Sequence, residues 1–381
     1  MSEPTFDHAA DPGELREGAL RRLRRLVTLE SPSDDEVRLR AIAADFSAEL
    51  VGLGAKVETR DAPGVGEHVI GRLPGGDPTL QPVMILGHLD TVHAVGSFDP
   101  VFRVEDGRAY GPGTFDMKGG WACVLEALAR LHAAGRTPRR PVLVVATCDE
   151  ETGSETSRGL IEELARAADA VLVPEPPFPD GSAKTRRKGV SWYRLTAHGQ
   201  ASHAGLAPDE GVNAVVELAH QVLSITALAD PGAGTTVSVD ETAGGTASNV
   251  VPARAWAVID VRFTGRAEAE RIEAAMRSLE PVLPGARLEL EGGINRPPME
   301  RTPGIAALYE RARELAAEAG WPLGEGLSGG ASDGSLTAGI GVPTLDGIGP
   351  VGHGAHAADE HVEVADLGRR AALYHRLLEV L

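Results

Sequence analysis

Three short runs of aliphatic residues constrain the fold of this chain more than any other feature. They cover residues 83–86, 142–145 and 171–173, and segments with helical periodicity separate them. Strands that are apolar throughout, rather than alternating, are typical of a sheet that helices cover on both faces. We therefore predict an α/β domain with a mixed, largely parallel sheet and helices on both faces.

Helical periodicity appears on both sides of these runs and again near the end of the chain. The predicted helices cover residues 13–28, 34–53, about 118–134, about 156–168, 304–319 and the segment from about 364. An apolar stretch near 342–348 lies between the last two helices and completes the alternation. The α/β pattern thus begins near the N-terminus and resumes near the C-terminus.

A different order of elements interrupts this alternation after about residue 188. The predicted elements are a strand at 191–199, a helix at 211–226, strands at 235–241 and 253–264, a helix at 266–281 and a strand at 286–292. The order β-α-β-β-α-β is that of a ferredoxin-like α+β unit. We predict a domain inserted at residues 189–296 between two parts of the α/β domain, 1–188 and 297–381.

Bulk properties exclude several classes of partner. With 381 residues the chain is long enough for two domains, and its net charge of −18 argues against nucleic acid or an anionic membrane surface. Only two cysteines occur, Cys123 and Cys148, and the N-terminus has neither a basic start nor an apolar run. No stretch approaches the roughly 20 apolar residues of a membrane span. We therefore expect a cytoplasmic protein without disulfide bonds or a signal peptide.

Acidic and imidazole side chains follow each of the three apolar runs. They are His88 and Asp90 after the first run, Glu150 and Glu151 after the second, and Glu175 after the third, joined by Asp116 in a glycine-rich loop that leads into a helix. Ligands bind at the carboxyl ends of the strands in open α/β sheets. We therefore expect these side chains to meet at one edge of the sheet.

Taken singly, each of these features has an ordinary structural explanation. A His-x-Asp after a strand, a pair of glutamates or one acid beside prolines is more often structural or solvated than functional. Together they conflict, because closely spaced carboxylates cannot all ionise without a compensating cation. A bound metal removes that conflict, and mixed histidine and carboxylate ligands suit zinc with an open position.

The motifs, in chain order, resemble those of the zinc aminoacylase/carboxypeptidase family. They are GHLDTV at 87–92, GPGTFDMKGG at 111–120, DEETGS at 149–154, PEP at 174–176 and a late histidine. Among its members, which include desuccinylases and deacetylases, glutamate carboxypeptidases are most similar in GPGTFDMKGG, in ASHAG at 201–205 and in GVNA at 211–214. The resemblance covers nearly the whole chain, and it implies that the inserted domain is a lid or dimerisation domain.

The resemblance implies hydrolysis of an amide or peptide bond next to a free carboxylate, in a peptide or acyl-amino acid. One alternative is an N-acyl-amino-acid deacylase or a dipeptidase of the same family. A second alternative, from another class, is a metal-dependent binding protein without catalysis. The presence of both the expected base, Glu150, and the expected bridge, Asp116, argues against this second alternative.

The resemblance also implies two zinc ions per subunit, although the same ligands suit Co²⁺ or Mn²⁺. The implied ligands are His88 and Glu175 for one ion, Glu151 and His356 for the other, and Asp116 as the bridge. Asp90 would hold the His88 ring and raise its basicity. Glu150 would be the general base and would not bind metal.

His356 competes with two other histidines for its role. The tail contains His353, His356 and His361 within nine residues. The family has its ligand just before a short segment that ends in glutamate, and this favours His356. His353 stands where glycine is common in the family, which is a departure from the pattern.

Four further residues are candidates for contact with the substrate. His203 alone would more often be a surface residue, but the resemblance implies that it stabilises the oxyanion, often from a partner subunit, and hence implies a homodimer. Asn249 is a candidate for the scissile carbonyl or the substrate carboxylate. The guanidinium of Arg296 suits a free carboxylate, the alternative being a hinge arginine in a salt bridge. Gly330 could add a backbone N–H to the same group.

Overall fold

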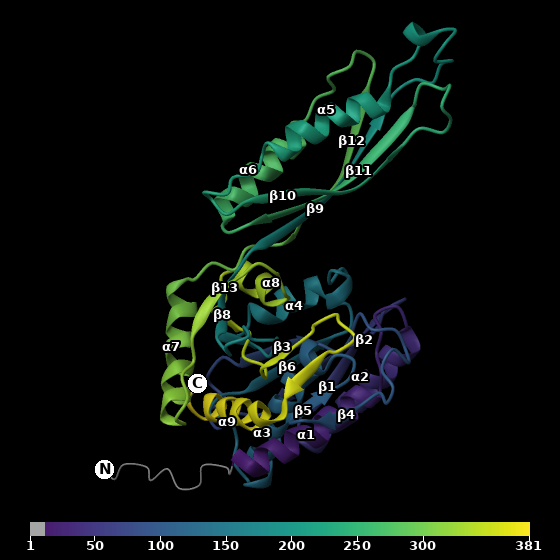
Figure 1. The fold of residues 1–381 in the computed structure, drawn as a ribbon. Helices are drawn as coiled ribbons and strands as arrows, with labels where there is room; N and C mark the ends of the chain where they lie inside the picture. The colour runs from purple at the N-terminus through teal and green to yellow at the C-terminus, as the bar shows by residue number, and fades with distance from the viewer. Residues whose placement is uncertain (1–11) are drawn as a thin grey trace. The chain divides into compact units, whose positions relative to one another are not determined.

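The computed structural model describes residues 12–381. The first eleven residues, which include most of the segment on which the absence of a signal peptide was predicted, lie outside this range. The chain forms two compact units (Figure 1). Unit 1 comprises the chain up to Thr185 with Arg301–Leu327 and Ser332–Leu381, and unit 2 comprises Arg186–Glu300 with Ser328–Ala331.

An eight-stranded sheet forms the centre of unit 1. Its order is β1 (Lys56–Ala62), β2 (Gly66–Leu73), β6 (Val142–Thr147), β3 (Val83–His88), β7 (Ala170–Val173), β14 (Thr344–Asp346), β8 (Ala183–Arg187) and β13 (Glu325–Ser328). The four strands β6, β3, β7 and β14 run parallel to one another, so their carboxyl ends share one edge. Every residue of β3 and β6 is buried. These findings confirm the predicted mixed, largely parallel sheet.

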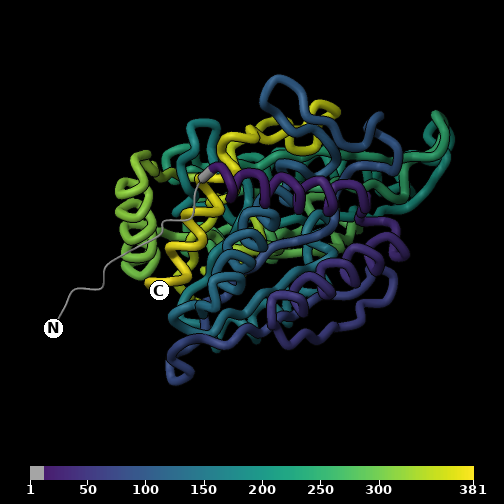
Figure 2. Tube along the Cα trace, turned by 90° about the horizontal axis from the view of Figure 1, so that it is seen from below, coloured from purple at the N-terminus to yellow at the C-terminus, as the bar shows by residue number. Residues whose placement is uncertain are grey.

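Helices cover both faces of this sheet. Successive side chains of a buried strand point to opposite faces, so each face of the sheet has its own core. Val83 and Ile85 of β3 join a core with α1, α2, α3, α7 and α9, whereas Met84 and Leu86 join a second core with α4 and α8. Figure 2 shows α1, in purple, beside the yellow C-terminal helix α9, and these two helices pack together. The bounds are α1 (Pro12–Thr28), α2 (Glu36–Gly52), α3 (Gly119–Ala133), α4 (Arg158–Ala165), α7 (Pro303–Glu318), α8 (Gly334–Gly339) and α9 (Val364–Val380).

Unit 2 is an antiparallel sheet with two helices packed on it. The sheet order is β10 (Thr236–Gly244), β11 (Arg254–Phe263), β9 (Gly189–His198) and β12 (Arg287–Arg296), and the helices are α5 (Ala214–Thr226) and α6 (Arg266–Arg277). Alternate residues of β11, from Ala255 to Phe263, are buried, and they form a core with residues of α5 and α6. The β-α-β-β-α-β prediction is confirmed.

A small third sheet was not predicted. It runs β15 (Gly352–His353), β16 (His361–Glu363), β5 (Arg108–Tyr110) and β4 (Arg103–Glu105), and β16 contacts the short turn η1 (Thr114–Lys118). Two further short turns are η2 (Glu150–Thr152) in unit 1 and η3 (Pro208–Glu210) in unit 2. Strands of two or three residues are too short for an alternating pattern to emerge. Within residues 12–381, no helix is long and apolar enough to cross a membrane. The two cysteines are buried and free.

Candidate metal centre

Four of the five predicted ligands come from the ends of adjacent strands and from the turn η1. His88 is the last residue of β3, and Glu151 lies in η2, which begins soon after β6 ends. Glu175 follows β7 after a single proline. Asp116 lies in η1, directly before α3, and Gly113 precedes this turn with a φ of 72°. Because β3, β6 and β7 run parallel, all of these groups belong to the same edge of the sheet.

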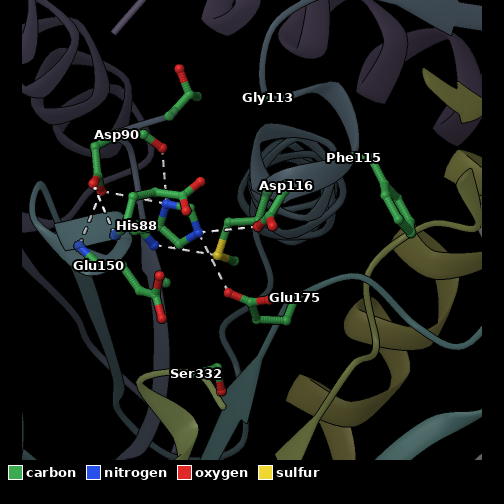
Figure 3. A network of polar contacts seen from close by, with 12 residues as sticks. His88, Asp90, Gly113, Phe115, Asp116, Glu150, Glu175 and Ser332 are labelled. Atoms are coloured by element: carbon green, nitrogen blue, oxygen red, sulfur yellow. Dashed lines mark hydrogen bonds and ion pairs between the residues drawn. The ribbon is translucent and has the colours of Figure 1, made fainter. Parts of the chain in front are cut away.

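Asp116 lies between two histidines and presents a different oxygen to each. Its Oδ1 is 3.2 Å from His88 Nε2, and its Oδ2 is 3.6 Å from His356 Nε2. Glu175 Oε1 lies 3.4 Å from His88 Nε2 on the first side, and Glu151 Oε2 lies 3.1 Å from His356 Nε2 on the second. Figure 3 shows His88, Asp116 and Glu175 pointing toward one another. The cluster therefore has two halves that share Asp116.

The two halves differ in exposure. The His88 side chain is 1% exposed, whereas the His356 side chain is 54% exposed. His356 also adopts a φ of 65°, a left-handed backbone conformation that few non-glycine residues take. His353 instead lies opposite His361 in the pair formed by β15 and β16. The structure thus brings His356 to Asp116 and Glu151 from an exposed turn.

Asp90 holds the centre together through both its backbone and its side chain. The His88 ring donates from Nδ1 to the Asp90 carbonyl oxygen at 2.9 Å, while the nearer carboxylate oxygen is 3.4 Å away. This contact directs Nε2 of the ring toward Asp116. The Asp90 carboxylate accepts the backbone N–H groups of Glu150 at 3.3 Å and Glu151 at 3.2 Å, and the Ser33 hydroxyl at 3.0 Å. It therefore fixes the η2 turn as well as the ring.

The electrostatics of the cluster favour positive charge. Burial lowers the pKa of His88, yet its hydrogen bonds with carboxylates raise that pKa well above the ordinary value. Hydrogen bonds with Asp116 and Glu151 raise the pKa of His356 to about 10. Burial raises the pKa of Asp116, but hydrogen bonds with the two histidines outweigh burial and lower it. Protons on the imidazoles and divalent cations are thus alternative ways to balance these carboxylates.

The donor set fits divalent zinc. Nitrogen and oxygen atoms of His88, Asp116 and Glu151 lie within 4.8 Å of one another, which a single small cation could span. Two imidazoles and three carboxylates are ligands that zinc accepts, and cobalt and manganese accept them too. A shared carboxylate with one imidazole on each side suits a pair of ions.

His203 and Asn249 lie together in unit 2. The backbone N–H of Ala204 donates to the Asn249 carbonyl oxygen at 2.9 Å, and His203 pairs with Val250. The side chains of His203 and Asn249 are both exposed. His203 Nδ1 accepts the backbone N–H groups of Gly205 and Leu206, each at 3.1 Å. The neutral ring therefore carries its proton on Nε2, where it is available to an acceptor.

Arg296 and Gly330 also belong to unit 2, and both have partners within it. Arg296, the last residue of β12, is buried, and its Nη1 donates to Asn295 Oδ1 at 3.1 Å. Gly330 N donates to Ser328 Oγ at 3.2 Å, and the Gly330 carbonyl accepts Arg187 Nη1 at 3.2 Å. Arg187 is a buried guanidinium that the sequence did not single out.

Several buried carboxylates around the centre were also missed. Asp149 accepts Thr156 N at 2.8 Å and Thr156 Oγ1 at 2.6 Å, which ties the segment after η2. Asp333 accepts the Ser154 hydroxyl at 2.6 Å. Glu360 accepts backbone N–H groups of the loop that carries Asp116. The sequence held no signal for these roles, because an acid that binds backbone amides has no characteristic spacing.

Comparisons with known proteins agree with this site. The model for peptidase family M20/M25/M40 matches residues 84–380. Carboxypeptidase G2 of Pseudomonas sp. strain RS-16 is 34% identical over 371 residues, covering 94% of this chain and 88% of its own length. A succinyl-diaminopimelate desuccinylase of Methylorubrum populi is 32% identical over 362 residues, covering 88% of this chain and 92% of its own.

Solved structures share the fold at lower identity. Aminopeptidase PepT of Bacillus cereus aligns with a TM-score of 0.75 at 22% identity and covers 95% of this chain and 98% of its own. An M20 family metallo-carboxypeptidase of Sulfolobus solfataricus aligns with a TM-score of 0.72 at 17% identity, covering 94% and 98%. At these identities the likeness shows the fold alone.

Proposed function

Because the chain belongs to peptidase family M20/M25/M40, and is therefore a metallopeptidase or amidohydrolase, we propose that it cleaves an amide or peptide bond next to a free carboxylate. The observation that carries this proposal is the position of Asp116, with one oxygen toward each histidine. Similarity to carboxypeptidase G2 supports a carboxypeptidase activity.

Two zinc ions are the proposed cofactor. His88 and Glu175 would hold one ion, Glu151 and His356 the other, and Asp116 both. Zinc bound there would lower the pKa of a water molecule toward neutrality and polarise the scissile carbonyl. Asp90 would keep the His88 ring oriented for its ion and would hold the backbone of Glu150 and Glu151 in place.

Glu150 is the proposed general base. It would take a proton from the attacking water and return it to the departing amine. Its backbone is tied to Asp90, whereas Glu151, next in the chain, has its side chain directed at His356. His203 would donate its Nε2 proton to the oxyanion, because Gly205 and Leu206 occupy its other nitrogen.

The substrate carboxylate is assigned to unit 2. Arg296 carries the guanidinium proposed to bind it, with Asn249 and the Gly330 backbone as further donors. Arg296 Nη1 also donates to Asn295 Oδ1 at 3.1 Å. The proposed domains are residues 1–188 and 297–381 for catalysis and 189–296 for the lid.

Unit 2 is also the proposed dimerisation surface. Among residues 12–381, strand β10 is the end strand of its four-stranded sheet, so one of its edges pairs with no other strand of that sheet. Helix α5 exposes Val215, Val216 and Leu223, the last at 71% exposure. An open strand edge beside exposed apolar residues suits association with a second copy. The cytoplasmic location inferred from the sequence is part of the same proposal, and two buried free cysteines fit a reducing compartment.

A substrate panel tests the proposal. The zinc-loaded protein would be assayed with peptides that end in glutamate, with the same peptides amidated at the C-terminus, and with N-acyl amino acids. We expect hydrolysis only where a free carboxylate adjoins the scissile amide, so the amidated peptides should be inert. Preference for acyl-amino acids would favour the deacylase alternative. Equal cleavage of free and amidated peptides would refute the proposed recognition.

A further inference from the structure

Glu360 is a buried carboxylate that binds the loop presenting Asp116. Its side chain is 0% exposed. Glu360 Oε1 accepts the backbone N–H of Phe115 at 2.7 Å and that of Asp116 at 2.8 Å. Glu360 Oε2 accepts Gly113 N at 2.9 Å and contacts His93 Nε2 at 2.6 Å. One carboxylate therefore holds three backbone amides of a single turn.

The turn needs such support because its backbone is unusual. Gly113 has a φ of 72°, and a Cβ added there would lie 2.5 Å from Thr91 Cγ2. A residue with a side chain would therefore not fit at this position without a shift of its neighbours. Figure 3 shows Asp116 beside the His88 ring, with Phe115 pointing away from it. Backbone amides that turn inward must find acceptors, and Glu360 supplies them.

Glu360 also links this turn to the segment that carries His356. The two residues lie in the same short loop between β15 and β16. The Glu360 carbonyl accepts the Gly111 N–H at 3.3 Å, and the next residue, His361, pairs with Tyr110. The loop that presents His356 and the turn that presents Asp116 are thus joined through Glu360.

The charge of Glu360 is part of this arrangement. Lys118, at the end of the same turn, is fully buried and interacts electrostatically with Glu360. An uncharged amide in its place would leave the Lys118 ammonium without this partner. It would also turn an NH₂ group toward backbone N–H groups, and donors that face donors lose their hydrogen bonds.

We propose that Glu360 is a positioning residue of the metal centre, which fixes the backbone at 113–116 so that Asp116 can present one oxygen to each cation and keeps the His356 loop in register with Asp116. This inference rests on the proposed two-metal function. Glu360 would not itself contact a cation. Its contribution is to the geometry of Asp116 and His356, and so to the more exposed half of the centre.

The test is a Co²⁺ titration of the full-length chain after removal of metal by a chelator. Calorimetry gives the stepwise affinities, and the visible absorption of bound cobalt reports the geometry of each site. For Glu360→Gln we expect about 10- to 100-fold weaker binding at the weaker site, the range for residues that support metal ligands. The cobalt spectrum should change as well. The matched control is Glu217→Gln, since Glu217 is a buried carboxylate of unit 2 that also accepts backbone amides.

Each outcome separates this inference from the proposed function. If the unaltered chain binds no cobalt, the two-metal function fails. If the unaltered chain binds two ions and Glu360→Gln binds both with unchanged affinity and spectrum, the positioning role fails alone. Should Glu360→Gln not fold, Glu360→Asp, which keeps the charge but shortens the side chain, would be titrated in the same way. If neither variant folds, Glu360 serves the fold, and the positioning role is overturned.

Discussion

Unit 2 surrounds its buried carboxylate, Glu217, with hydrogen-bond donors, whereas unit 1 surrounds Asp116 with imidazoles and other acids. Glu217 accepts Leu283 N at 2.7 Å, Val282 N at 3.0 Å and Gln221 Nε2 at 2.7 Å. Asp116 faces two histidines, which are themselves shared with Glu175 and Glu151. The first arrangement is complete within the chain. In the second arrangement, the negative charge of the carboxylates is balanced only by protons on the imidazoles or by bound cations, and this marks it as a functional site.

The largest expected effect separates chemistry from metal binding inside unit 1. Glu150→Gln removes the proposed base but none of the proposed ligands, so turnover should fall about 10²- to 10⁴-fold while metal content stays at the unaltered level. The measurements are kcat and metal content of the same preparation. Turnover at the unaltered rate would show that Glu150 is not the base.

The two halves of the metal centre should respond differently to loss of a ligand. His88 is buried and held by Asp90, whereas His356 is exposed, so His88→Ala disrupts the core of the centre and His356→Ala only its rim. We expect His356→Ala to keep one tightly bound ion and to bind the second at least about tenfold more weakly. His88→Ala should weaken both. Titration with zinc measures this, and equal losses in the two variants would remove the distinction between the halves.

Metal removal should destabilise unit 1 and leave unit 2 unchanged. A ligand present at 100 times its Kd stabilises the folded state by about 2.7 kcal/mol. Hydrogen exchange with and without chelator should therefore show lost protection in β3 and β6, near the centre, with β9 and β11 unaffected. Equal loss in both units would mean that their stabilities are not separate.

The smallest effect concerns Glu217 and its pH dependence. Burial raises the pKa of Glu217, but hydrogen bonds from Leu283, Gln221 and Val282 outweigh it and lower the pKa below its ordinary 4.5. A carboxylate with a depressed pKa stabilises the fold above pH 4.5, and that contribution is lost as pH falls through the folded value. Glu217→Gln should lower the stability of unit 2 by about 1–3 kcal/mol at pH 7. Its deficit should shrink in acid, and a deficit that grows instead would contradict the assignment.

Much of the fold was predictable because apolar runs and helical periodicity in the sequence indicate its strands and helices. The parallel strands β3, β6 and β7 and the order of elements in unit 2 followed from these patterns. The third sheet did not, because strands of two or three residues have no period. Its absence from the prediction also hid the link between Tyr110 and His361.

The candidate site was predictable to the same extent. His88 ends a buried parallel strand, and Glu151 and Glu175 follow two others, so their convergence could be inferred from strand ends. Asp116 was inferred from its glycine-rich loop, and the resemblance added His356. Asp116 presents one oxygen to each histidine because of the shape of its turn. That shape depends on Gly113 and on Glu360, which is distant in sequence. Such through-space support leaves no local pattern in the chain.

We propose above that Asp116 bridges two divalent cations. Anomalous diffraction at the zinc edge, from crystals of the zinc-loaded protein, tests it most directly. We expect two peaks per chain, one beside His88 and Glu175 and one beside His356 and Glu151, with Asp116 between them. A single peak on one side of Asp116, or zinc bound elsewhere, would contradict it.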